Sequence, residues 1–444
     1  MNIPRLFRKY FIPTLAGMLG MCAVTAIDGI FVGHGVGSDG IAAINILIPV
    51  FMFLMGVGLM VGAGCSVVAS IHLAQGRIKA ARINITQAMG FVTLTALLIS
   101  ALLLLFPRQA ARWLGASNSL APLVVDYLLW FTPSFVFAIW TTVALFVIRL
   151  DGAPRLAMMC SLVTAIVNVI LDWLFIFPFG WGIMGAASAS AVSTVIGGTM
   201  AVVYLFSYAR QLRFYPLKMS RKSLRLSMRN LGYQCRIGSS ALLNEATMAM
   251  LMFVGNLVFM HYLGDNGVGA FGIACYYAPF VFMVGNAVAQ SVQPIISYNF
   301  GGNNRRRVYE AARIALSTAL LCGTAVTGVF VLFPDFLTRL FISLDTPAAQ
   351  IAVTGFPLFA AGFIFFILNL TVIGYYQSIE QVLPATLFAL LRGFFFLIPA
   401  FVLLPRLLGT SGIWLAMPLS ETATTLSILL LYLLKKRNRP DREI

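Results

Sequence analysis

The chain has 444 residues, of which 60% are hydrophobic and only 10% charged, with a formal net charge of +16 and a mean hydropathy of +0.92. Soluble globular proteins carry roughly 25% charged residues, so this composition excludes an ordinary soluble protein and indicates a membrane protein. The six cysteines lie within or at the edge of apolar runs and form no C-x-x-C pair, which argues against a zinc site and a disulfide framework.

Apolar segments follow one another along the chain, each long enough for the ~20 residues that cross the hydrocarbon layer as a helix. The first follows the basic stretch MNIPRLFRKYF without a small-residue cleavage site, so we interpret it as a span and not as a removable signal peptide. Membrane β-strands would instead alternate over ~10 residues. The sequence predicts an all-α integral membrane protein with twelve transmembrane helices at 11–33, 41–71, 84–106, 120–148, 154–177, 183–208, 237–262, 268–298, 314–333, 347–376, 382–404 and 410–434.

Basic residues gather in every second loop. With the N-terminus placed in the cytoplasm, the cytoplasmic segments hold most of the 30 Lys and Arg residues. This bias predicts that both termini are cytoplasmic, and it explains the positive charge without a nucleic-acid partner. The basic residues outside these segments are Arg108, Arg112, Arg339 and Arg406 in outer loops and Arg392 within a span.

The two halves of the chain resemble each other. VGHGVGSDGIAAINI (32–46) resembles FMHYLGDNGVGAFGI (259–273), and WGIMGAASASAVST (181–194) resembles SGIWLAMPLSETAT (411–424). Each half has an even number of spans, which predicts two pseudo-symmetric six-helix lobes around a central cavity, as in alternating-access transporters. The predicted domains are an N-lobe (1–208), a basic, hinge-like cytoplasmic linker (209–236), a C-lobe (237–434) and a basic cytoplasmic tail (435–444).

Polar residues within the spans cluster in the first half. Asn168 and Asp172 are four residues apart and so share one face of span 5. Counted from the span ends, Asp28 in span 1 and Ser190 in span 6 lie at a similar depth in the outer half of the lobe. The fold does not require the cluster, because the repeat pairs Asp28, Asn168 and Asp172 with apolar residues or glycine: Gly255, Ile398 and Val402.

A carboxylate in hydrocarbon costs ~3 kcal/mol on insertion scales, and two carboxylates close together favour a shared proton or cation. We therefore interpret Asp28 and Asp172 as the site of a coupling ion, H⁺ or Na⁺, with Asn168 and Ser190 completing its oxygen shell. The alternative is a buried hydrogen-bond cluster that ties spans 1, 5 and 6 together. No other metal and no cofactor is indicated.

Three charged residues in spans of the second half, Glu245, Glu421 and Arg392, are candidates for a substrate site or a polar site in the C-lobe. Arg392 in span 11 needs a partner within the membrane, and either glutamate could serve. A buried structural ion pair is the favoured role for Arg392. Glu421 could instead contact a cationic substrate, and Glu245 could take part in transport or form a structural pair.

Three segments resemble the multidrug and toxic compound extrusion (MATE) family, nearer its prokaryotic DinF-like and MepA-like members. They are DGIFVGHGVGSDGIAAINILIPV, VNVILDWLFIFPFGWGIMGAASAS and QPIISYNFGGNNRRRVYEAARI. The likeness covers essentially the whole chain. It implies antiport across the bacterial cytoplasmic (inner) membrane, in which a monomer exports organic, often cationic, compounds in exchange for Na⁺ or protons.

The resemblance also implies roles for particular residues. The family's ion site in the N-lobe maps onto Asp28, Asn168, Asp172 and Ser190, with serine standing where the family has threonine. The hydroxyl survives this change, although the lost methyl group could loosen the site. NorM-type members pair a glutamate in span 7 with an aspartate in span 10; span 10 here has no acid, so Glu245 lacks that mate.

Other classes of function fit less well. A major facilitator would carry G-x-x-x-D-R-x-G-R between spans 2 and 3, where this chain reads HLAQGRIKAAR. A lipid-linked oligosaccharide flippase of the same superfamily would need several deep arginines for pyrophosphate, and only Arg392 lies deep. A channel or receptor would not need paired acids. Nothing points to an enzyme, and the expected partners are small organic cations and membrane lipids.

Overall fold

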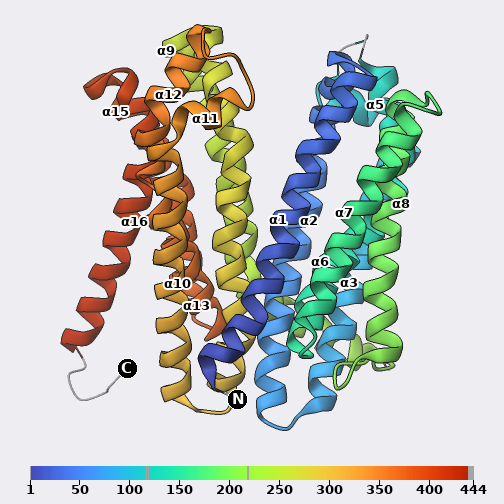
Figure 1. Cartoon of the computed structure of the whole chain (residues 1–444). Helices are drawn as coiled ribbons and strands as arrows, with labels where there is room; N and C mark the ends of the chain where they lie inside the picture. The colour runs from blue at the N-terminus through green and yellow to red at the C-terminus, as the bar shows by residue number, and fades with distance from the viewer. Residues whose placement is uncertain (1, 117, 119, 218–219, 439–444) are drawn as a thin grey trace. The chain divides into compact units, whose positions relative to one another are not determined.

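The computed structural model describes residues 2–116, 118, 120–217 and 220–438, and all secondary structure within them is helical (Figure 1). The all-α fold predicted from the sequence is confirmed. Part of the predicted basic tail, residues 439–444, lies outside the described residues, as do residues 218–219 of the linker.

The elements are α1 (Ile3–Gly35), α2 (Ser38–Ala74), α3 (Ile78–Leu105), α4 (Pro107–Trp113), α5 (Ala121–Phe131), η1 (Thr132–Ser134), α6 (Phe135–Leu150), α7 (Pro154–Ile176), α8 (Gly182–Val203), η2 (Tyr204–Tyr208), α9 (Arg221–Gly301), α10 (Arg305–Leu332), α11 (Pro334–Arg339), α12 (Pro347–Ala360), α13 (Phe363–Ser378), α14 (Val382–Leu390), η3 (Leu391–Phe395), α15 (Leu397–Leu408) and α16 (Thr410–Asn438).

Ten helical segments in the described part of the chain are long and apolar enough to cross a membrane, and α12 and α13, which are bent by 45° relative to each other, are long and apolar enough when taken together. The 81 residues of α9 would reach about 120 Å at 1.5 Å per residue, roughly four times the hydrocarbon thickness. This helix is broken at Gly264, whose φ of 59° and ψ of −153° favour glycine. Helix α9 therefore holds two of the predicted spans, and all twelve are found.

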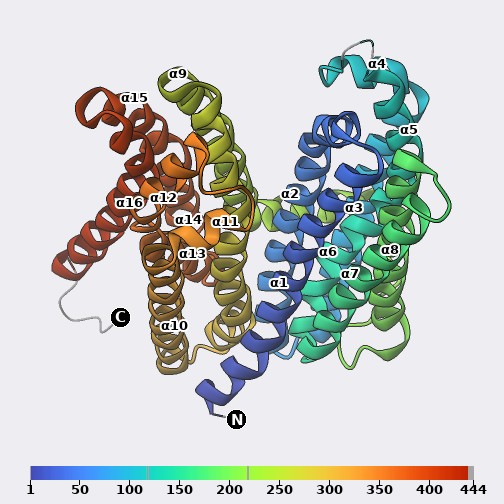
Figure 2. The same cartoon turned by 45° about the horizontal axis from the view of Figure 1, so that its top comes forward.

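The chain divides into two compact units. We call Ile12–Gly238 the N-terminal unit, and Ser239–Ile444 together with Met1–Phe11 the C-terminal unit. Within the N-terminal unit, α6 packs against α2, α3 and α8, and α7 lies along α8 (Figure 2). The lobe limits at 208 and 237 stay predictions.

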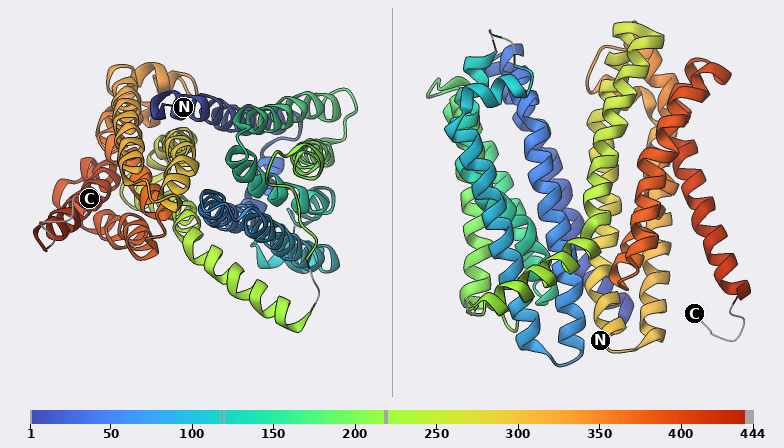
Figure 3. Two further views of the ribbon diagram at one scale, coloured as in Figure 1. Left: turned by 90° about the horizontal axis from the view of Figure 1, so that it is seen from below. Right: turned by 180° about the vertical axis from the view of Figure 1, so that it is seen from behind.

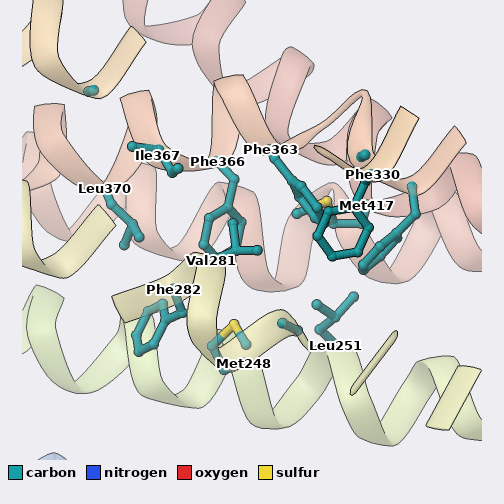
Figure 4. Close-up of a cluster of buried hydrophobic side chains, with 14 of the residues drawn as sticks. Met248, Leu251, Val281, Phe282, Phe330, Phe363, Phe366, Ile367, Leu370 and Met417 are labelled. Atoms are coloured by element: carbon teal, nitrogen blue, oxygen red, sulfur yellow. The ribbon is translucent and has the colours of Figure 1, made fainter. Parts of the chain in front are cut away.

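The two units are packed with different kinds of side chain. Small residues such as Ala69, Ala88 and Ala144 are fully buried in the core of the N-terminal unit. Phenylalanines dominate the C-terminal core, where Phe330, Phe363 and Phe366 lie among aliphatic side chains (Figure 4). Lipid is as apolar as these side chains, so close packing, more than the removal of apolar surface from water, holds such helices together.

The basic linker is fastened to the N-terminal unit. Asp151, at the end of α6, accepts hydrogen bonds from the backbone N–H groups of residues 210–212 and from the hydroxyl of Tyr204. Further along, Gln234 Nε2 donates to Asn84 Oδ1 at 2.8 Å. The segment that the sequence suggested as hinge-like is thus held by side chains of α3 and by the C-cap of α6.

Candidate functional site

Two helices of the N-terminal unit, α1 and α7, approach each other through glycines. A Cβ added at Gly17 would lie 3.4 Å from the Cα of Met158, and one added at Gly20 would lie 2.6 Å from a methyl carbon of Leu162. Small residues allow this close approach of helices within a membrane. The contact brings α1 onto the same face of α7 that carries the polar residues of the predicted ion site.

Asp28 on α1 and Asp172 on α7 come together in this arrangement. Their carboxyl groups lie close together. Asp172 is fully buried, and Asp28 is half-buried. The structure therefore brings together the two acids that depth counting along spans 1 and 5 had placed at the same level.

Three of the four carboxyl oxygens in this pair, Oδ1 of Asp28 and both oxygens of Asp172, are buried without a hydrogen-bond partner. Two ionised carboxylates can only accept hydrogen bonds, so neither can satisfy the other. A proton on either carboxyl group would let it donate to its neighbour, and a cation would be ligated by both. The pair is chemically incomplete without one or the other.

Asn168 and Ser190, the other two residues of the predicted ion site, contact each other. Asn168 is buried one turn from Asp172 on α7, and its Nδ2 donates to Ser190 Oγ on α8 at 3.3 Å. Helix α8 can approach α7 closely because the residues that precede Ser190, 186–189, are small and buried. The side-chain Oδ1 of Asn168 is left as an oxygen that could face a bound cation.

Sequence reasoning missed Tyr127 on α5, which completes the cluster. This residue is 5% exposed, and its hydroxyl forms a hydrogen bond with Ser190. It also lies close enough to Asp28 and Asp172 to interact electrostatically with both. Its ring packs against Phe131, with 5.4 Å between the ring centroids. No sequence signal marked it, because tyrosine near the outer end of a membrane span is ordinarily an interface residue.

The deep charged residues of the C-terminal unit form a different arrangement. Arg392 Nη2 donates to Glu421 Oε1 at 2.8 Å, and Arg392 Nε donates to the same oxygen at 3.0 Å. Asn369 Nδ2 donates to the other carboxylate oxygen, Oε2, at 2.7 Å. Of the two partners considered for Arg392, the structure gives it Glu421, and both carboxylate oxygens of Glu421 accept hydrogen bonds.

Further contacts complete the surroundings of Arg392. Its Nη1 donates to Asn244 Oδ1 at 3.3 Å, and its Cζ lies 4.4 Å from the centroid of the Phe366 ring, a cation–π contact. Arg392 belongs to the π-helical turn η3, and its carbonyl accepts a hydrogen bond from Ser420 Oγ at 2.6 Å. The network is closed and its charges compensate each other, which fits the structural ion pair favoured for Arg392.

Glu245 stands apart from this network. It is half-buried on α9, next to Asn244 in the chain, and no hydrogen bond or ion pair joins it to another residue in the described ranges. Among the residues that the structure describes, no group of three or more His, Cys, Asp or Glu side chains could hold a metal ion. The structure thus unites Arg392 with Glu421 and leaves Glu245 outside.

Comparison with known families gives a consistent result. A sequence model of the family described as MatE matches residues 13–174 and 241–402, which together make up well over half of the chain. The two matches have equal length and fall one in each half, in agreement with the internal repeat seen in the sequence.

Individual relatives are similar over nearly their whole length. The chain is 26% identical over 440 residues to the multidrug export protein MepA of Staphylococcus aureus, covering 97% of this chain and 94% of that protein. It is similar in fold to an outward-facing multidrug resistance MATE family transporter of the MOP superfamily, with a TM-score of 0.89, 20% identity and coverage of 98% and 96%. The Vibrio cholerae MATE transporter VcmN gives a TM-score of 0.89 at 21% identity, with 98% of each chain covered.

Proposed function

This chain belongs to the MatE family, and from that premise we propose that it exports organic, often cationic, compounds in exchange for a coupling ion, H⁺ or Na⁺, bound in the N-terminal unit. Relatives named as multidrug export proteins align with nearly the whole chain, which supports the class of substrate. The observation that carries the proposal of ion coupling is the pair Asp28 and Asp172, in which three of the four carboxyl oxygens are buried without a hydrogen-bond partner.

The coupling site would draw its ligands from several helices of one unit. Asp28 and Asp172 would supply the negative charge, while Asn168 Oδ1 and the hydroxyl of Ser190 would add neutral oxygens, the ligand type that hard cations prefer. A single proton shared between the two carboxyl groups would satisfy the same atoms. Either ion removes the repulsion between the two acids, so the same residues serve both alternatives.

Ion binding can drive export only if the ion and the exported compound favour different states of the protein. A ligand shifts a conformational equilibrium by its difference in affinity for the two states, and no further. We propose that the ion stabilises the N-terminal unit in a form that releases the organic compound. Protonation or ion binding at residues on α1, α5, α7 and α8 would alter how these four helices pack.

The flippase alternative is less well supported. A pyrophosphate-linked lipid would need free cationic side chains deep in the protein. Arg392, the arginine within a predicted span, is buried and has its charge compensated by Glu421 at 2.8 Å. An organic cation therefore suits these units better than an anionic lipid as the transported compound.

The membrane setting is part of the same proposal. The distribution of basic residues supports cytoplasmic N- and C-termini and insertion in the bacterial inner membrane. The monomer is proposed as the transporting species, because each chain carries both six-span halves.

The test is export of a fluorescent organic cation from everted vesicles, first under an imposed proton gradient and then under a sodium gradient. The variants are Asp28→Asn and Asp172→Asn, with Asp335→Asn as a control because Asp335 is an exposed acid at the start of α11. We expect both site variants to lose gradient-driven export while the control keeps it. The gradient that drives the wild-type protein identifies the ion.

Two results would contradict the proposal. Full gradient-driven export in both site variants would make the aspartate pair a packing feature and move attention to Glu245. Export that ignores both gradients in the wild-type protein would exclude H⁺ and Na⁺ as coupling ions.

A further inference from the structure

The first part of α9, residues 221–236, presents a basic stripe on its surface. Arg221, Arg225 and Arg229 are spaced four residues apart and therefore share one face of the helix, with Lys222 beside them. All four side chains are exposed. No Asp or Glu occurs anywhere between Asp172 and Glu245 in the chain, so no acid of this segment neutralises the stripe.

The opposite face of the same segment is fixed to its own unit by polar contacts. Gln87 on α3 donates to Ser227 Oγ at 2.8 Å, and Asn230 donates to Gln87 Oε1 at 3.4 Å. Gln234 is fully buried against Asn84. These contacts set the rotation of the helix about its axis, and they turn the arginine stripe away from the protein.

Apolar side chains flank the stripe on both sides. Leu224 is 63% exposed and Met228, one turn later, is 62% exposed. Leu226 is exposed on the other flank. In water this pattern would leave apolar surface uncovered, whereas a helix lying in the headgroup layer buries such side chains and keeps its basic groups at the phosphates.

The position of the segment in the chain agrees with that setting. It begins shortly after Tyr208, where one span ends, and leads at residue 237 into the next predicted span, so both of its ends lie at the same membrane face. In Figure 3 the lime-green segment runs crosswise to the helices of the N-terminal unit. A helix crosswise to the spans lies along the membrane plane.

We propose that residues 221–236 form a binding surface for anionic phospholipids of the leaflet that this segment faces. The arginines contact the phosphate and anionic headgroup, and Leu224 and Met228 insert beside the acyl chains. Arginine suits this role because its planar guanidinium binds phosphate oxygens bidentately. Because the helix is fastened to α3, a bound lipid is held by the N-terminal unit. The surface uses no residue of the proposed ion site, so the proposal of lipid binding can be tested independently of ion coupling.

The test measures lipid binding to the purified full-length protein in detergent by native mass spectrometry. The probes are dioleoyl phosphatidylglycerol and dioleoyl phosphatidylcholine, which share acyl chains and differ in headgroup charge. The stripe variant is Arg221→Gln/Arg225→Gln/Arg229→Gln. Its matched control, Arg305→Gln/Arg306→Gln/Arg313→Gln, removes three exposed arginines from α10.

We expect the stripe variant to lose roughly tenfold or more in affinity for phosphatidylglycerol, since each basic group near an anionic surface contributes separately. The control should stay within about twofold of the wild-type protein. Leu224→Ser/Met228→Ser should weaken the binding of both lipids. Soluble glycerol phosphate should not displace the bound lipid.

Three outcomes would overturn the proposal. The stripe variant could keep the wild-type preference for phosphatidylglycerol, or the control could lose the same affinity. Displacement by glycerol phosphate at millimolar concentration would assign the surface to a soluble anion instead of a lipid.

Discussion

The N-terminal and C-terminal units each hold a cluster of polar side chains among apolar helices, and the clusters differ in how their carboxyl groups are satisfied. In the N-terminal unit, three of the four carboxyl oxygens of Asp28 and Asp172 are buried without a hydrogen-bond partner. In the C-terminal unit, Glu421 is paired with Arg392 and also accepts from Asn369. The first cluster leaves carboxyl oxygens without a partner, whereas the second satisfies them with an arginine and an amide of the same unit.

The repeat shows how closely related these two positions are. The alignment of 181–194 with 411–424 pairs Ser190 with Ser420, and Glu421 is the next residue. Both clusters therefore use the same part of the last helix of their six-span half. A guanidinium from η3 in the C-terminal unit takes the role that a bound proton or cation would have in the other unit. The difference teaches that two halves of a duplicated fold can place unpartnered carboxyl groups in one half and a buried ion pair in the other.

The largest effect is expected from removing both acids of the N-terminal cluster. Asp28→Asn/Asp172→Asn should lower gradient-driven export roughly 5- to 150-fold, the range of typical coupling energies. The apparent melting temperature of the purified protein should not fall, because two amides can donate and accept between themselves. A large drop in melting temperature would indicate that the aspartates hold the helices together, as in the alternative of a structural hydrogen-bond cluster.

Breaking the C-terminal cluster should affect stability instead. Arg392→Met leaves the buried Glu421 carboxylate without its counter-ion, which should reduce the free energy of unfolding by ~3–5 kcal/mol. Arg392→Met/Glu421→Leu removes both charges and should recover most of that loss. Unfolding in detergent, followed by circular dichroism, measures the difference. If the double variant is as unstable as the single one, the loss of stability does not come from the unpaired charge of Glu421.

A smaller effect should follow from loss of the hydroxyl at Ser190. Ser190→Ala leaves the amide of Asn168 without its acceptor and removes a neutral ligand, so half-maximal export should need about tenfold more ion. Ser190→Thr restores the family's residue and should stay within about twofold. Ser420→Ala, at the equivalent position of the C-terminal unit, is the matched control. Equal shifts in Ser190→Ala and Ser420→Ala would mean that the two units do not differ in ion binding.

The sequence predicted the spans well because each one is long and apolar. The repeat, the polar cluster of Asp28, Asn168, Asp172 and Ser190, and the need of Arg392 for a partner followed from residue types and from depth along the spans. These are properties of single helices, for which spacing in the chain determines position. A charge in hydrocarbon is energetically costly, so each ionisable residue within a span is expected to have a partner or a function.

What the sequence could not predict depends on the rotation and packing of several helices. From the sequence, Glu245 and Glu421 are equally good partners for Arg392, because the choice depends on the orientation of α16, and no pattern marks Asn369 as a neighbour of Glu421. The linker is predicted from composition alone, and composition does not reveal that Asp151 accepts hydrogen bonds from the N–H groups of residues 210–212. Long-range side-chain contacts of this kind leave no periodic trace in the chain.

The smallest effect is expected at Tyr127, the residue that sequence reasoning missed. Tyr127→Phe keeps the ring packed against Phe131 and removes one hydrogen bond to Ser190, which is worth ~1 kcal/mol, or about fivefold in the ion concentration for half-maximal export. Tyr277→Phe is the matched control, because the hydroxyl of Tyr277 donates to the carbonyl of Leu337 at 2.9 Å in the C-terminal unit. If Tyr127→Phe shifts the ion dependence and Tyr277→Phe does not, the ion site extends to α5. A general loss of packing would instead lower the melting temperature in both variants. An unchanged ion dependence in Tyr127→Phe would limit the site to α1, α7 and α8.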